Sequence, residues 1–340
     1  MQLVQSRTLE QVEPAAVVDR SGASPDALFA DRSGASPDAG RQAVIDTLLA
    51  ELEKNGAVTL PPLVPEDTLA EMQTTFANRL RHMSINSIEG YQRGELFRKT
   101  VDNVLTLSQG FVDIGLHPIV TGVIGRYIGS RYGLCEAKGW QTQPTSTDFN
   151  SWHGDAWYDQ DKIKGQIPRE VKLAFFLSDV NSGAFEYLKQ THQQRAPHAL
   201  KKQEKLQLDT SGMLQFLGAA GTAVLFDTSG IHRQGVPVLE PRRAVFYNYH
   251  DRDIPVQKED VDYYRYHPLI LNAAFLGDLT AEQSRVLGFG HKERLQLDHT
   301  RSPRFPALHG AMTAANTLAL KFDGARGRIT DKLRRVLKLS

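Results

Sequence analysis

A candidate metal site lies in the stretch Ser151-Trp152-His153-Gly154-Asp155-Ala156-Trp157, and the fold of the chain is predicted from the strands around it. His153 and Asp155 stand two residues apart, so in an extended chain both side chains point to the same face. An imidazole beside a carboxylate suits a borderline divalent metal ion. The pair alone is a weak signal, because such pairs also arise in hydrogen-bonded turns. Its meaning therefore depends on the strands around it.

From about Gly133 onward, the sequence around this motif is typical of β-strands. Val171–Leu177 and Ala223–Phe226 are apolar on both faces, as expected for strands of a two-sheet core. Turn-forming residues separate the candidate strands, which lie near residues 136–143, 171–180, 184–188, 222–227 and 243–249. We predict a mainly β fold with flanking helices, built on a double-stranded β-helix of the jelly-roll or cupin-like kind.

Two helices and a short strand are predicted ahead of this core. Apolar residues from Val44 to Leu52 follow the spacing of an amphipathic helix, which Gly56 ends. Ala57–Leu60 is predicted to be a strand, and Pro65-Glu-Asp begins a second helix.

The chain divides by composition into three parts. Residues 1–40 contain a duplicated Asp-Arg-Ser-Gly-Ala-Ser-Pro-Asp-Ala sequence and few large apolar side chains, which predicts a flexible leader. Residues 41–270 form the β domain with its N-terminal helices. Residues 271–340 form a helical C-terminal extension, in which Thr280-Ala-Glu-Gln283 is a candidate capping box. Its basic amphipathic end, residues 326–340, is expected to pack on the protein, with weak contact to a membrane surface as the alternative.

A second histidine with suitable surroundings follows the motif. His232 comes after the candidate strand 222–227, and Arg243 begins the next alternating strand. Period-two alternation leads us to expect the Arg243 guanidinium in the interior that His232 borders, with Arg242 on the opposite face. A buried guanidinium needs a carboxylate, which a dicarboxylate chelating a metal at its other end would supply.

Together, residues 44–250 resemble the phytanoyl-CoA dioxygenase family of iron(II)- and 2-oxoglutarate-dependent oxygenases. The stretches that carry the resemblance are Asn55–Leu60 with Pro65-Glu-Asp, Trp152-His-Gly-Asp155, Leu173–Val180 with Gly183–His192, and His232-Arg-Gln-Gly235 with Arg243. The resemblance implies that His153, Asp155 and His232 are the catalytic iron ligands. It also implies that Arg243 binds the distal carboxylate of 2-oxoglutarate.

Some positions depart from the pattern of that family. Lys189-Gln190 stand where the family usually has Pro-Gly, and Pro237 lies near a common Asn, so loop shape and substrate contacts can differ there. His192 is expected to be a structural histidine bonded to backbone, because no suitable arginine follows it.

Four further residues are candidates for binding. Gln141 is expected to bind 2-oxoglutarate and Gln143 the substrate, with exposed strand glutamines as the alternative. Trp157 and Tyr158 are expected to wall the substrate pocket, with aromatic core packing as the alternative.

Composition excludes several other classes of protein. Lys and Arg total 40 against 39 Asp and Glu, so the formal charge of +1 gives no basic field for nucleic acid. The single cysteine, Cys135, excludes an intramolecular disulfide and a Cys-rich zinc site. No apolar run approaches the roughly 18 residues that span a bilayer. We expect a cytoplasmic protein with a small-molecule partner.

The resemblance implies hydroxylation of an unactivated C–H bond in a small molecule or biosynthetic intermediate, with Fe(II), 2-oxoglutarate and O2. The carboxylate at Asp155 favours this outcome, or a related desaturation or ring closure, because related halogenases have a small residue there that lets chloride bind the iron. Two alternatives stay open: a cupin-like zinc or manganese isomerase or hydrolase, and a non-catalytic binding protein of the same fold.

Overall fold

The computed structural model describes residues 37–82, 97–101, 104–155, 168–194, 207–254, 269, 271–277, 279–289 and 318. The chain divides into two compact units, Met1–Phe289 and Gly290–Ser340, and in the second only Leu318 is described. Residues 1–36 of the predicted leader and the predicted basic helix at 326–340 lie outside the described residues. Residues 37–40 already belong to the first helix.

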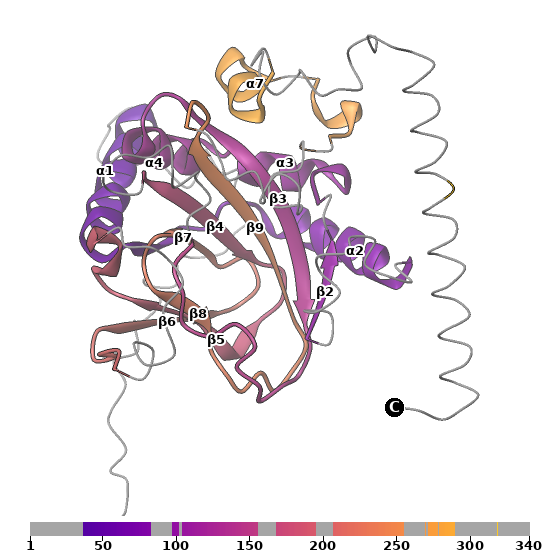
Figure 1. Ribbon diagram of the computed structural model, residues 1–340. Helices are drawn as coiled ribbons and strands as arrows, with labels where there is room; N and C mark the ends of the chain where they lie inside the picture. The colour runs from indigo at the N-terminus through magenta and orange to yellow at the C-terminus, as the bar shows by residue number, and fades with distance from the viewer. Residues whose placement is uncertain are drawn as a thin grey trace, which may run out of the picture. The chain divides into compact units, whose positions relative to one another are not determined.

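The first unit consists of antiparallel strands with helices before and after them (Figure 1). Its elements are α1 (Pro37–Asn55), β1 (Ala57–Leu60), α2 (Glu66–His82), β2 (Arg98–Val101), η3 (Val104–Thr106), α3 (Gln109–Gly115), α4 (Pro118–Ile128), β3 (Tyr132–Thr142), β4 (Glu170–Phe176), β5 (Val180–Leu188), η4 (Thr191–Gln194), β6 (Met213–Gly218), β7 (Ala223–Asp227), β8 (His232–Gln234), β9 (Arg242–Asp251), η5 (Ala273–Phe275) and α7 (Ala281–Leu287).

The strands form two sheets, as the predicted jelly roll requires. The larger sheet has the order β1-β7-β4-β9-β3-β2, and the smaller one has the order β6-β5-β8. Most neighbouring strands in these sheets are not consecutive in the chain, as in a double-stranded β-helix. The predicted fold class, mainly β with flanking helices, is confirmed. None of the helices within the described ranges is long and apolar enough to cross a membrane.

Two hydrophobic clusters mark the two faces of the larger sheet. On β4, Leu173 and Phe175 pack in one cluster with buried residues of α1 to α4, so this face is covered by helices. Ala174 and Phe176 pack in the other cluster with Phe216 of the smaller sheet. Alternate residues of one strand therefore enter different cores, which explains why β4 carries apolar residues on both of its faces from Leu173 to Phe176.

The predicted local signals at both ends of this unit are confirmed. Gly56 ends α1 with a φ of 82°, a conformation that glycine adopts without steric cost. The helix α2 begins directly after Pro65. Thr280 and Gln283 form the reciprocal hydrogen bonds of a capping box at the start of α7.

Candidate metal centre

The side chains of His153, Asp155 and His232 converge at one point between the sheets. Their ligand atoms all lie within 4.8 Å of one another, and they are the one such cluster in the part of the chain that the structure describes. Backbone pairing brings them together: the amide of His153 donates to the carbonyl of His232 at 3.0 Å, and the reverse bond is 2.8 Å. The amide of Asp155 donates to the Thr228 carbonyl at 2.6 Å. The HxD segment is therefore held against the start of β8.

Both imidazoles are oriented by the backbone. Nδ1 of His153 lies 2.7 Å from the Ser151 carbonyl oxygen, and Nδ1 of His232 lies 2.8 Å from that of Gly230. A carbonyl only accepts, so Nδ1 carries a proton in each ring, and Nε2 is the atom through which the neutral form of either ring can bind a metal. The two Nε2 atoms lie 3.7 Å and 3.8 Å from carboxylate oxygens of Asp155. Backbone carbonyls orient metal-binding histidines in this way, by accepting a hydrogen bond from the ring nitrogen that does not bind the metal.

The protonation states also suit a metal. Burial, with the nearby His153 ring, lowers the pKa of His232 to about 3. Burial raises the pKa of Asp155, but Lys172, His232 and His153 outweigh it and hold that pKa below its usual range. At neutral pH the site thus has a neutral His232 and an ionised Asp155, the forms that bind metal.

The donor set fits Fe(II). Two imidazole nitrogens and one carboxylate leave further coordination positions open, which is the arrangement of non-haem iron oxygenases. Zinc and manganese accept the same three donors, so the donor set alone does not choose between iron and these metals.

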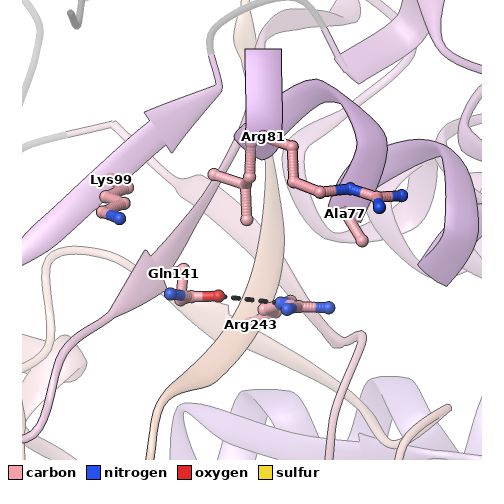
Figure 2. A pocket seen from close by; sticks show the side chains of 6 residues that line it. Ala77, Arg81, Lys99, Gln141 and Arg243 are labelled. Atoms are coloured by element: carbon pink, nitrogen blue, oxygen red, sulfur yellow. Dashed lines mark hydrogen bonds between the residues drawn. The ribbon is translucent and has the colours of Figure 1, made fainter. Parts of the chain in front are cut away.

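Arg243 and Gln141 do not face this cluster. Residues of β9 with the same parity as Arg243, such as Val245 and Tyr247, pack in the helix-covered core. Nε of Arg243 donates to Oε1 of Gln141 at 2.9 Å. Figure 2 shows the pair at a cavity of about 550 Å³ lined by Ala77, Leu80, Arg81, Lys99, Gln141 and Arg243. The prediction that Arg243 enters the interior bordered by His232 is wrong, and Gln141 shares its face.

Arg242 occupies the interior position instead. Its cross-strand partner is Thr142, whose hydroxyl donates to Oε1 of Gln234 at 3.3 Å, and Gln234 lies on β8 two residues after His232. Arg98 pairs with Thr142 from the other side and also donates to Oε1 of Gln234, at 3.3 Å. We call Arg98, Thr142, Gln234 and Arg242 the interior anion pocket.

Two donors of the interior anion pocket are ready for a ligand. Nε of Arg242 and Nε2 of Gln234 are buried, and neither has a hydrogen-bond partner among the described residues. Burial lowers the pKa of Arg242 to about 10, which leaves it charged at neutral pH. A buried cation without a carboxylate costs free energy that an anionic ligand would recover.

The remaining predicted residues have mixed outcomes. Gln143 lies just past β3, where its backbone N–H donates to the Phe97 carbonyl at 2.7 Å. Trp157 and Tyr158 lie outside the described residues. Nε2 of His192 lies 3.0 Å from the Glu53 carbonyl oxygen, which confirms its backbone bond. Gln190, which stands where the family usually has a glycine, has a φ of 67°, a left-handed conformation that glycine adopts more readily than other residues.

Two interior residues of β4 were not predicted from the sequence. Nζ of Lys172 donates to Oδ2 of Asp155 at 2.8 Å, and Nδ2 of Asn248 donates to Oε1 of the buried Glu170 at 2.8 Å. The available signal was a charged residue inside an otherwise apolar strand, because a buried charge is retained only where it has a partner.

Glu170 should make the stability of the metal-free protein depend on pH. Burial raises the pKa of Glu170 well above its ordinary value of 4.5. Its stabilising contribution is therefore complete below pH 4.5 and is lost as pH rises toward the folded-state pKa. We expect Glu170→Gln to lack this loss, a difference of up to about 1.4 kcal/mol per pH unit in that window. Urea unfolding of both proteins at pH 5 and pH 8 measures it, and parallel pH profiles would contradict it.

Gly230 should tolerate no side chain. A Cβ there would lie 1.8 Å from the hydroxyl oxygen of Tyr187, which is fully buried and donates to the Asp227 carbonyl. We expect Gly230→Ala to lower the free energy of unfolding by about 3 kcal/mol. Gly277→Ala is the control, because a Cβ at Gly277 would meet no atom within 4 Å. Urea unfolding of the two variants tests this, and equal stabilities would refute it.

Comparison with known proteins gives one family and several similar folds. A family model described as phytanoyl-CoA dioxygenase (PhyH) matches residues 52–235, more than half of the chain. No curated protein sequence matches the chain.

The similar solved structures are distant in sequence. The α-ketoglutarate-dependent epimerase SnoN from nogalamycin biosynthesis, in complex with Fe3+, α-ketoglutarate and nogalamycin RO, has a TM-score of 0.49 and 17% identity over 71% of this chain and 91% of that chain. HygX from Streptomyces hygroscopicus, with nickel, 2-oxoglutarate and hygromycin B bound, has a TM-score of 0.46 and 15% identity over 64% of this chain and 93% of that chain.

Proposed function

This chain belongs to the phytanoyl-CoA dioxygenase (PhyH) family of Fe(II)- and 2-oxoglutarate-dependent enzymes, and from that premise we propose that it hydroxylates an unactivated C–H bond of a small molecule. The observation that carries the proposal is the His153, Asp155 and His232 cluster with an anion pocket on the same interior side. A metal site alone fits many reactions. A metal site beside a buried, unpartnered guanidinium donor fits a metal-chelating dicarboxylate.

The three clustered side chains would hold Fe(II) through Nε2 of each histidine and the Asp155 carboxylate. The bound metal, with 2-oxoglutarate and O2, supplies the oxidising chemistry: 2-oxoglutarate is decarboxylated to succinate and CO2, and one oxygen atom enters the substrate. The contribution of the protein is to fix the ligands, and the carbonyls of Ser151 and Gly230 do this for both rings.

Arg242 takes the role that the sequence suggested for Arg243. Its guanidinium and the amide of Gln234 offer N–H donors to the distal carboxylate of 2-oxoglutarate. Thr142 and Arg98 both donate to Oε1 of Gln234, so this amide is held with its Nε2 available for the ligand. The pocket thus orients the cosubstrate as well as neutralising its charge.

Aromatic rings keep water away from the buried side of the site. The ring of His232 lies 5.2 Å from that of Phe226, 5.8 Å from Phe185 and 6.3 Å from Tyr187, measured between centroids. An apolar wall strengthens the electrostatic interactions inside and limits side reactions with solvent. The substrate itself, the small-molecule class of partner and the cytoplasmic location stay predictions.

The proposal is tested with Fe(II) and 2-oxoglutarate added to the apo protein without oxygen. We expect a weak visible charge-transfer band, then succinate on admission of O2 and, with a true substrate, a product 16 mass units heavier. A product two mass units lighter would replace hydroxylation by desaturation or ring closure. Absence of the band in folded protein would favour the zinc or manganese enzyme or the non-catalytic binding protein.

A further inference from the structure

Lys172 contacts a proposed metal ligand from the interior face of β4. Its Nζ donates to Oδ2 of Asp155 at 2.8 Å, and both side chains are only 12% exposed. The cross-strand partners of Lys172 are Asn248 on β9 and Phe226 on β7. Phe226 also borders the His232 ring, so Lys172 reaches the metal centre from the sheet rather than from solvent.

The charges nearby leave Lys172 and Asp155 as a matched pair. Burial raises the pKa of Glu170, two residues before Lys172, so this carboxyl favours its neutral form. Glu136 lies opposite Asn248 on β3 and forms an ion pair with Lys138. Without a metal, the positive charge of Lys172 therefore offsets the negative charge of Asp155.

We propose that Lys172 is a positioning residue that makes metal and 2-oxoglutarate binding depend on each other. The inference rests on the proposed function. Lys172 donates a hydrogen bond to Oδ2 of Asp155, so the other carboxylate oxygen, Oδ1, is left to bind the metal. Its charge opposes a divalent ion bound alone and favours the ion together with a dianionic cosubstrate.

Simple charge counting gives the direction of each effect. A metal binds the neutral form of each histidine, so Lys172 and Asp155 are the two opposite charges at the metal position itself, and a divalent ion makes this position strongly positive. The two negative charges of 2-oxoglutarate then offset the charge of the divalent ion. A unit charge about 6 Å from a divalent ion changes binding by about tenfold even at the dielectric constant of water. Lys172 thus weakens the first binding step and strengthens the second.

Replacing Lys172 with methionine should move the two affinities in opposite directions. We expect Lys172→Met to bind Ni(II) about tenfold more tightly, because a repulsive charge is lost and Asp155 loses a competing donor. We expect the Ni(II)-loaded variant to bind 2-oxoglutarate about tenfold more weakly. Damage to the fold would weaken both steps, so the rise in metal affinity is a readout that a merely structural role would not give.

The measurement is calorimetric titration of Ni(II) into the apo protein, then of 2-oxoglutarate into the Ni(II)-loaded protein, with no turnover needed. Lys172→Arg keeps the charge and should stay within about threefold of the wild type in both steps. Lys99→Met is a matched control on the exposed part of β2 and should change neither. Lys172→Gln serves in place of the methionine variant if the latter does not fold.

The outcomes separate this inference from the proposed function. If the wild type binds no Ni(II), or if bound Ni(II) does not strengthen 2-oxoglutarate binding, the proposed function itself fails. If the wild type does both, a Lys172→Met protein with unchanged affinities, or with both affinities weakened, overturns the role of Lys172. An arginine variant that behaves like the methionine variant overturns the role of charge.

Discussion

Asp155→Ala is expected to abolish 2-oxoglutarate turnover, lowering succinate formation by about a thousandfold or more. The carboxylate is the anionic member of the cluster, and its ligand atoms lie within 4.8 Å of those of both histidines. Its loss removes one of three ligands and leaves Lys172 buried without its carboxylate partner. Succinate release under air and Ni(II) titration of the apo protein measure the two consequences.

The matched control for this variant is Asp148→Ala. Asp148 precedes the motif by a few residues, and its carboxylate forms an ion pair with Arg233 at 3.0 Å near the surface. We expect Asp148→Ala to change succinate formation by less than about threefold, because exposed ion pairs contribute little. An Asp155→Ala protein that still turns over 2-oxoglutarate at the wild-type rate would remove Asp155 from the metal centre.

Arg242→Leu should raise the KM for 2-oxoglutarate about 100-fold, whereas Arg243→Leu should leave it within about twofold. The two arginines are neighbours in sequence, but only Arg242 shares a face with Thr142 and Gln234. Arg243 donates instead to Gln141 on the helix-covered face. Succinate formation as a function of 2-oxoglutarate concentration distinguishes the two variants.

Each arginine variant controls for the other, because both remove one guanidinium from the same end of β9. A similar free energy of unfolding for the two proteins would show that the change in KM is local. The reverse pattern, with a raised KM for Arg243→Leu alone, would restore the assignment made from sequence and refute the interior anion pocket.

Much of the site follows from local sequence. The HxD pair has the right chemistry because its two residues share a face in extended chain, and the structure joins this pair to His232 through backbone hydrogen bonds. The helix ends could also be predicted from the sequence, because Gly56 and the capping box at Thr280 each depend on only a few neighbouring residues. These signals can be recognised in the sequence because the residues that interact lie only a few positions apart.

The face on which Arg243 lies could not be decided in the same way. Alternation correctly separated Arg242 from Arg243, but both faces of β9 are buried, one by helices and the other by the smaller sheet. When both sides of a strand are apolar, hydrophobicity no longer says which one borders the metal. The contact of Lys172 with Asp155 could not be predicted from local sequence either, because 17 residues separate the two in the chain.

The sequence by itself determined the two N-terminal helices, the main strands of the core, the family, and the three residues that can bind a metal. Only the tertiary structure decided which arginine accompanies them and which lysine holds Asp155. The physical reason is that periodicity fixes where a side chain points relative to its own strand. The layer that it meets depends on how distant segments pack against that strand.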